Sequence, residues 1–118
     1  QDILLQINIG REESKGGFLT EELPALLPEL GKFTNIRVQG LMAIPPICQD
    51  ATKNDKFFQE IYRIGVDIRE KKYDNVWVNI LSMGMSDDYE SAIRCGSTMI
   101  RVGTAIFGAR DYTKTHQP

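Results

Sequence analysis

Two turns rich in glycine, serine and threonine stand close together near the end of the chain. The first reads LSMGMSDD, residues 81–88, and the second reads RVGT, residues 101–104. Ser86 places a hydroxyl directly before a predicted helix, where free backbone N–H groups favour an anion. Gly103 lets a ligand approach the main chain closely, and Thr104 adds a second hydroxyl. Together the two turns predict a two-sided cup for a phosphate group.

Ser86 also has a purely structural interpretation. Serine is a favoured helix N-cap, so its hydroxyl can cap the helix predicted for residues 87–95 and do nothing else. On spacing alone this interpretation is favoured over phosphate binding. Asp87 and Asp88 suit the positive end of that helix but would repel a phosphate, so we expect both carboxylates to point to solvent.

Arg101 is an unusual residue for the strand predicted at residues 99–107. A buried guanidinium costs several kcal/mol unless it is paired. Side chains alternate along a strand, so Arg101 and Gly103 share a face, and we expect Arg101 to line the same pocket. A cation in a phosphate pocket indicates a ligand with a second hydrogen-bonding group. The alternative is an outward-facing Arg101 paired with a helix carboxylate.

Few other residues could carry chemistry. The single histidine, His116, lies in the sequence TKTHQP at the end of the chain, which argues against a histidine-based catalytic or metal site. Cys48 and Cys95 lack metal-ligand spacing and are expected as two reduced, inert thiols. The lysines to consider as nucleophiles are all expected on the solvated surface; they are Lys15, Lys71 and Lys72.

Length and charge restrict the class of protein. The 118 residues correspond to about one domain. Lys and Arg total 14 against 16 Asp and Glu, a balance that argues against nucleic acid or an anionic membrane as the partner. No apolar run approaches the roughly 20 residues that cross a bilayer. Because the first residues, QDILLQINIG, do not resemble a secretory signal, we expect a cytoplasmic protein.

Strand and helix patterns alternate along the chain. Near-continuous apolar strands separated by helices predict a parallel sheet covered by helices, with Trp77 in the core. Pro28 falls inside the first helix and is expected to kink it. The predicted strands are 3–9, 36–44, 75–81 and 99–107, and the predicted helices are 20–30, 52–72 and 87–95.

Four strands and three helices amount to half of an eight-stranded α/β barrel, which takes about 250 residues. An isolated half would expose two sheet edges and one inner face. The alternative is a small, doubly wound open sheet, which needs helices on both faces. In either fold, function lies at the carboxyl ends of the strands, where both turns occur.

The sequence LSMGMSDDYESAIRCGSTMIRVGTAIFGARDY closely resembles the C-terminal signature of the pyridoxal phosphate homeostasis protein family. QINIGREESKGG and GLMAIPP resemble two further stretches of that family, so the resemblance covers nearly the whole chain. It implies the C-terminal half of a TIM-type (β/α)8 barrel, similar to the alanine racemase barrel domain, with four parallel strands alternating with helices. This partial domain is expected over residues 1–112, followed by a polar tail over residues 113–118.

The resemblance implies roles for individual residues. Ser86, Gly103 and Thr104 match the positions that bind the phosphate of pyridoxal 5′-phosphate (PLP), and Arg101 matches the arginine that faces the pyridine nitrogen. An arginine there leaves the ring a weaker electron sink, which suits a carrier or a racemase better than a transaminase. Met83 is added to the predicted cofactor-binding set because it flanks the glycine at the end of the third strand, although packing is the favoured interpretation of a methionine there.

The function implied is a non-catalytic PLP-binding protein of intracellular vitamin B6 homeostasis, with PLP-dependent enzymes as partners. No lysine here matches the one that forms a Schiff base in the family, so the N-terminal half of the barrel is expected as a missing partner. One alternative is a racemase-like enzyme, which would need a second catalytic domain. Another is a generic phosphate-binding fragment, although neither a P-loop nor a GxGxxG motif supports nucleotides.

Overall fold

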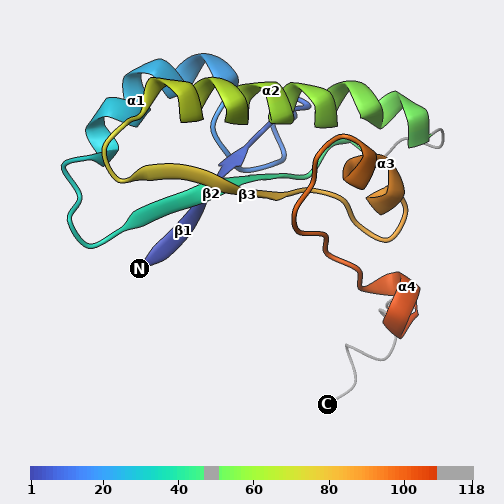
Figure 1. The fold of residues 1–118 in the computed structure, drawn as a ribbon. Helices are drawn as coiled ribbons and strands as arrows, with labels where there is room; N and C mark the ends of the chain where they lie inside the picture. Colours follow the sequence, from blue (N-terminus) through green and yellow to red (C-terminus); the bar gives the residue numbers. More distant parts are fainter. Residues whose placement is uncertain (47–50, 109–118) are drawn as a thin grey trace.

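A three-stranded parallel sheet forms the centre of the protein (Figure 1). The computed structural model describes residues 1–46 and 51–108. The strands lie side by side in chain order, so each connection crosses over the sheet through a helix, as parallel strands require. They are β1 (Asp2–Ile7), β2 (Arg37–Ala43) and β3 (Val76–Ser82).

The two long crossover helices lie on the same face of this sheet (Figure 1). They are α1 (Leu23–Leu30), preceded by the 3-10 turn η1 (Thr20–Glu22), and α2 (Asp55–Lys71), preceded by η2 (Ala51–Asn54). Two short helices follow the last strand, α3 (Tyr89–Arg94) and α4 (Thr104–Phe107). Within residues 1–46 and 51–108, no helix is long and apolar enough to cross a membrane.

The core lies between the sheet and α1 and α2. Leu5 and Ile7 of β1 stand in register with Leu41 and Ala43 of β2, and all four are buried. They belong to one hydrophobic cluster with apolar residues of β3 and both long helices. The helix members are Leu23, Leu27, Leu30, Phe58, Ile61 and Ile68.

Glycines set two close approaches in this core. Gly40 of β2 stands opposite Ile80 of β3, and a Cβ at Gly40 would overlap the Ile80 carbonyl. Gly65 lets α2 sit low on the sheet, because a Cβ there would lie 3.1 Å from Cγ1 of Val78. The strands and α2 therefore pack closely because these two positions lack side chains.

The opposite face of the sheet carries no covering helix in the described part of the chain (Figure 1). Trp77 is 45% exposed, so its predicted place in the core is wrong. Its neighbours Val76 and Val78 are buried, and strand alternation turns the residue between them the other way. A doubly wound sheet would need helices on both faces, which this arrangement does not provide.

The predicted fourth strand, residues 99–107, is wrong in extent. Met99 forms a single parallel bridge with Ser82, and the Arg101 N–H donates to the Gly84 carbonyl at 2.9 Å. Gly103 then turns the chain (φ −107°, ψ −66°) into α4, so the apolar pattern up to Phe107 belongs to a short helix. The predicted four-stranded sheet is accordingly a three-stranded sheet with a short paired segment at one edge.

Replacing Gly40 by alanine tests the close approach of β2 and β3. The new methyl group cannot avoid the Ile80 carbonyl without moving the backbone, so we expect a loss of about 1–3 kcal/mol in the free energy of unfolding. Urea denaturation measures it. Gly16→Ala is the matched control, because nothing lies within 4 Å of a Cβ there. Equal stability of the two variants would contradict this packing account.

Candidate functional site

A cavity of about 280 Å³ lies at the carboxyl ends of β2 and β3. Its walls come from the segment after β2, the residue before α2, the turn after β3 and the start of α4. Carboxyl ends of parallel strands meet at one edge of a sheet, which explains why these segments converge. The lining residues are Ile44, Pro45, Pro46, Asn54, Gly84, Met85, Ser86, Asp87, Asp88, Gly103 and Thr104.

Three of the five residues predicted to bind the cofactor line this cavity. Ser86 comes from the turn after β3, and Gly103 and Thr104 come from the start of α4. The two glycine-rich turns therefore lie together, as the sequence predicts. None of the described residues lies within 4 Å of a Cβ placed on Gly103, which leaves room beside its main chain for a ligand.

The acidic pair after Ser86 differs from expectation. Asp87 is exposed, but Asp88 turns inward. Its Oδ1 accepts a hydrogen bond from the Met85 N–H at 2.7 Å, and its Oδ2 accepts one from Asn54 Nδ2 at 3.2 Å. Asp88 is also the N-cap residue of α3, so the prediction that Ser86 caps a helix from residue 87 is wrong. The helix starts later because the Asp88 carboxylate closes the turn back onto Met85.

Arg101 flanks the cavity without being among its lining residues. Its Nη2 donates to the Ala43 carbonyl at 3.0 Å, one residue before Ile44 in the cavity wall. Its Nε is buried and has no partner within the described ranges. The alternation that would align Arg101 with Gly103 fails because the chain leaves the strand between them.

Two opposing effects act on the pKa of the Arg101 guanidinium. Burial lowers the pKa of its guanidinium, and the nearby Asp88 carboxylate raises it. Asp88 thus couples the cation to the turn that carries Ser86.

Met83 is fully buried within the hydrophobic cluster and does not line the cavity. As a flexible apolar side chain it fills the core behind the turn. Its predicted contact with the cofactor has no support in this packing.

Two residues at the cavity were not anticipated. Lys15 was expected on the solvated surface, but it is half-buried: its Nζ lies 3.3 Å from the Pro45 carbonyl and pairs with Glu12 at 2.8 Å. Asn54 is 3% exposed and contributes its amide to the wall. Neither residue belongs to a recognisable motif, because the contacts that bring it to the cavity join residues 30 or more positions apart in sequence.

The side chains of Ser97 and Thr98 hold the segment that follows α3 against β3. Thr98 Oγ1 accepts a hydrogen bond from the Leu81 N–H at 2.8 Å. Ser97 Oγ lies 2.6 Å from the Met83 carbonyl and 2.9 Å from the Met99 carbonyl. These bonds extend a ladder that is otherwise short, and so position the residues that follow.

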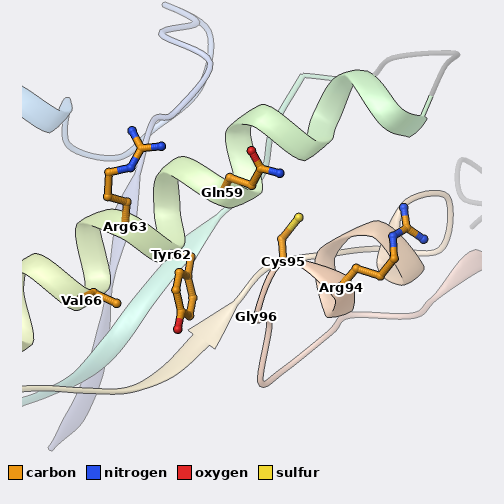
Figure 2. A pocket seen from close by; sticks show the side chains of 7 residues that line it. All are labelled: Gln59, Tyr62, Arg63, Val66, Arg94, Cys95 and Gly96. Atoms are coloured by element: carbon orange, nitrogen blue, oxygen red, sulfur yellow. The ribbon is translucent and has the colours of Figure 1, made fainter.

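A second, more open hollow of about 650 Å³ lies between α2 and α3 (Figure 2). It contains none of the predicted site residues; its walls are Gln59, Tyr62, Arg63, Val66, Arg94, Cys95 and Gly96. Burial is the main cause that raises the pKa of the Cys95 thiol, with Asp55 adding to it, so the thiol is protonated and a poor nucleophile.

The described residues contain no group of three or more His, Cys, Asp or Glu side chains that could hold a metal ion. Cys48 and His116, like the predicted tail 113–118, lie outside the described residues.

The chain and its fold belong to a recognised class of protein. The family model for the alanine racemase N-terminal domain matches residues 1–111, and the chain belongs to that family. Within it, the chain is similar to proteins named pyridoxal phosphate homeostasis protein, which confirms the resemblance noted in the sequence.

The similarity to these relatives is substantial but covers part of their length. The chain is 42% identical over 113 residues to the protein of Pasteurella multocida (strain Pm70), an alignment that covers 96% of this chain and 48% of the relative. Identity to the protein of Escherichia coli (strain K12) is also 42% over 113 residues, covering 96% and 47%. The chain spans about half the length of the curated relatives it matches.

Two solved structures of PipY have a similar fold to this chain. PipY of Synechococcus elongatus PCC7942 without PLP superposes with a TM-score of 0.82 at 31% identity, covering 91% of this chain and 49% of PipY. PipY with PLP bound gives a TM-score of 0.77 at 30% identity with the same coverage.

Thr98→Val tests the anchoring of the last segment. Valine keeps the shape of threonine but cannot accept the Leu81 N–H, so we expect a loss of about 1–3 kcal/mol in the free energy of unfolding. Thermal or urea unfolding measures it, and Thr34→Val, at an exposed position, serves as the control. Unfolding of Thr98→Val indistinguishable from that of the control would show that this bond does not hold the segment.

Proposed function

We propose that this chain supplies the phosphate-binding wall of a PLP site in a non-catalytic carrier protein of vitamin B6 homeostasis. The observation that carries the proposal is the cavity that unites Ser86 with Gly103 and Thr104 at the end of β3. Similarity to pyridoxal phosphate homeostasis proteins, and to a PipY structure with PLP bound, supports this ligand over other phosphate esters.

The residues present fit the phosphate end of this cofactor. Ser86 and Thr104 offer hydroxyl donors, and Gly103 leaves the backbone accessible, which suits an anion with several acceptor oxygens. The volume of about 280 Å³ is just below the roughly 300–1,000 Å³ of complete ligand pockets, in keeping with one wall of a larger site. When bound, PLP would supply an aldehyde and an electron-withdrawing pyridine ring.

Arg101 is proposed to act at the ring. Its buried Nε has no partner in the described part of the chain, so a donor is available beside the cavity. A guanidinium does not give up its proton, so it would hold an acceptor nitrogen of the ring unprotonated. Such a ring stabilises carbanions poorly, which favours storage and delivery of the cofactor over deep catalysis.

The remaining parts of the proposal concern the complete protein. The uncovered sheet face and the half-length match support a (β/α)8 barrel in which the other half supplies the missing wall and a cofactor-binding lysine. Residues 1–112 would form the C-terminal part of that domain, with a short polar tail. We infer a cytoplasmic carrier that delivers PLP to PLP-dependent enzymes.

Ser86→Ala tests the phosphate assignment. Loss of one hydrogen bond to a charged group should weaken PLP binding by about 1–2 kcal/mol, measured by isothermal titration calorimetry. Ser14→Ala, in an exposed loop, is the control. Unchanged PLP affinity in both Ser86→Ala and Thr104→Val would show that this cavity does not bind the phosphate of PLP.

Arg101→Ala tests the ring assignment. Affinity for the phosphate should stay close to that of the unaltered chain, while the absorption spectrum of bound PLP should shift because the ring loses its guanidinium partner. Arg63→Ala, on the exposed side of α2, should leave the spectrum unchanged. An unshifted spectrum contradicts the assignment, and measurable racemisation of an amino acid by the protein would favour the enzyme alternative.

A further inference from the structure

A hydrogen bond between an amide and a carboxylate joins two segments of the cavity wall, the start of α2 and the turn after β3. Asn54, the residue before α2, donates from Nδ2 to Asp88 Oδ2 at 3.2 Å. The other carboxylate oxygen, Oδ1, accepts the Met85 N–H at 2.7 Å. One carboxylate therefore ties the turn of residues 85–88 both to its own backbone and to the start of α2.

Asn54 also lines the cavity and carries an unpaired acceptor within the described residues. The residue is 3% exposed and lines the cavity, yet its Oδ1 has no hydrogen-bond partner among residues 1–46 and 51–108. Buried amide oxygens normally find a partner, so this unpaired oxygen marks the Asn54 amide as a polar group held beside the cavity. The amide is thus both a support for the turn and part of the wall.

The pair also answers an electrostatic difficulty. A carboxylate in the wall of an anion site would repel a phosphate. The two hydrogen-bond donors to Asp88, the Asn54 amide and the Met85 N–H, partly offset that charge and keep the carboxylate turned toward the protein. If the amide were lost, the carboxylate would be less fixed and the turn that carries Ser86 would be less ordered.

We propose that Asn54 and Asp88 form a positioning pair that fixes the turn of residues 85–88 for binding the phosphate group of the cofactor. This inference rests on the proposed function. It adds Asn54 and Asp88 to the residues of the proposed site, as groups that hold the turn through hydrogen bonds and do not contact the phosphate. Because the pair acts on the phosphate end, it should matter for PLP and not for pyridoxal, which has the same ring without the phosphate.

Asn54→Leu removes the donor at nearly constant volume and adds no charge. PLP affinity, measured by calorimetry, should fall about tenfold, the effect of one hydrogen bond to a charged group, while pyridoxal affinity stays within about twofold. The Met85 amide should exchange faster with deuterium in NMR spectra. Asn79→Leu, at an exposed position of β3, is the control and should change none of these.

The exchanged pair Asn54→Asp with Asp88→Asn provides the rescue. It keeps the net charge and one amide–carboxylate bond, so PLP affinity should return to within about threefold of the unaltered chain. Equal losses for PLP and pyridoxal, failure of the exchanged pair to rescue, or an unaffected PLP affinity in Asn54→Leu would each overturn the inference. If the unaltered chain binds no PLP, the proposed function is wrong. If the Met85 amide exchanges at the same rate in Asn54→Leu as in the unaltered chain, the pair does not fix the turn, whatever the outcome for PLP.

Discussion

The parallel pairing of residues 98–101 with the end of β3 is the constraint on which the candidate site depends. The Met83 N–H donates to the Met99 carbonyl at 3.0 Å and the Arg101 N–H to the Gly84 carbonyl at 2.9 Å, while Thr98 takes the Leu81 N–H on its side chain. This short ladder brings the start of α4 against the turn that carries Ser86. Without it, the two glycine-rich turns would be neighbours in sequence but not in space.

The hydrophobic core between the sheet and the helices α1 and α2 holds those strand ends in place. Buried apolar residues of all three strands face α1 and α2, and Gly40 permits the close contact of β2 with β3. The cavity then forms where the strands end and polar backbone groups become available. Lys15, in the loop after β1, contacts the segment after β2, and Asn54, at the end of η2, contacts the turn after β3, so the shape of the cavity depends on these contacts.

Much of this arrangement could be predicted from the sequence. The periodicities located three strands and the long helices, and the spacing of Ser86, Gly103 and Thr104 identified the meeting of two turns. The errors share a cause: local pattern does not report tertiary contacts. The apolar run 99–107 looks like a strand, but Gly103 turns it into a helix. Asp88 faces inward because Asn54, 34 residues earlier, donates to it. Trp77 is exposed because no helix among the described residues covers the face it occupies.

A titration of the ¹⁵N-labelled protein with PLP decides most directly between the cavity at the strand ends and the hollow between α2 and α3. If the account is correct, the largest backbone amide shifts will occur at Ser86, Gly103 and Thr104, and inorganic phosphate will reproduce part of them. Shifts concentrated at Tyr62, Cys95 and Gly96, in the hollow between α2 and α3, would contradict it.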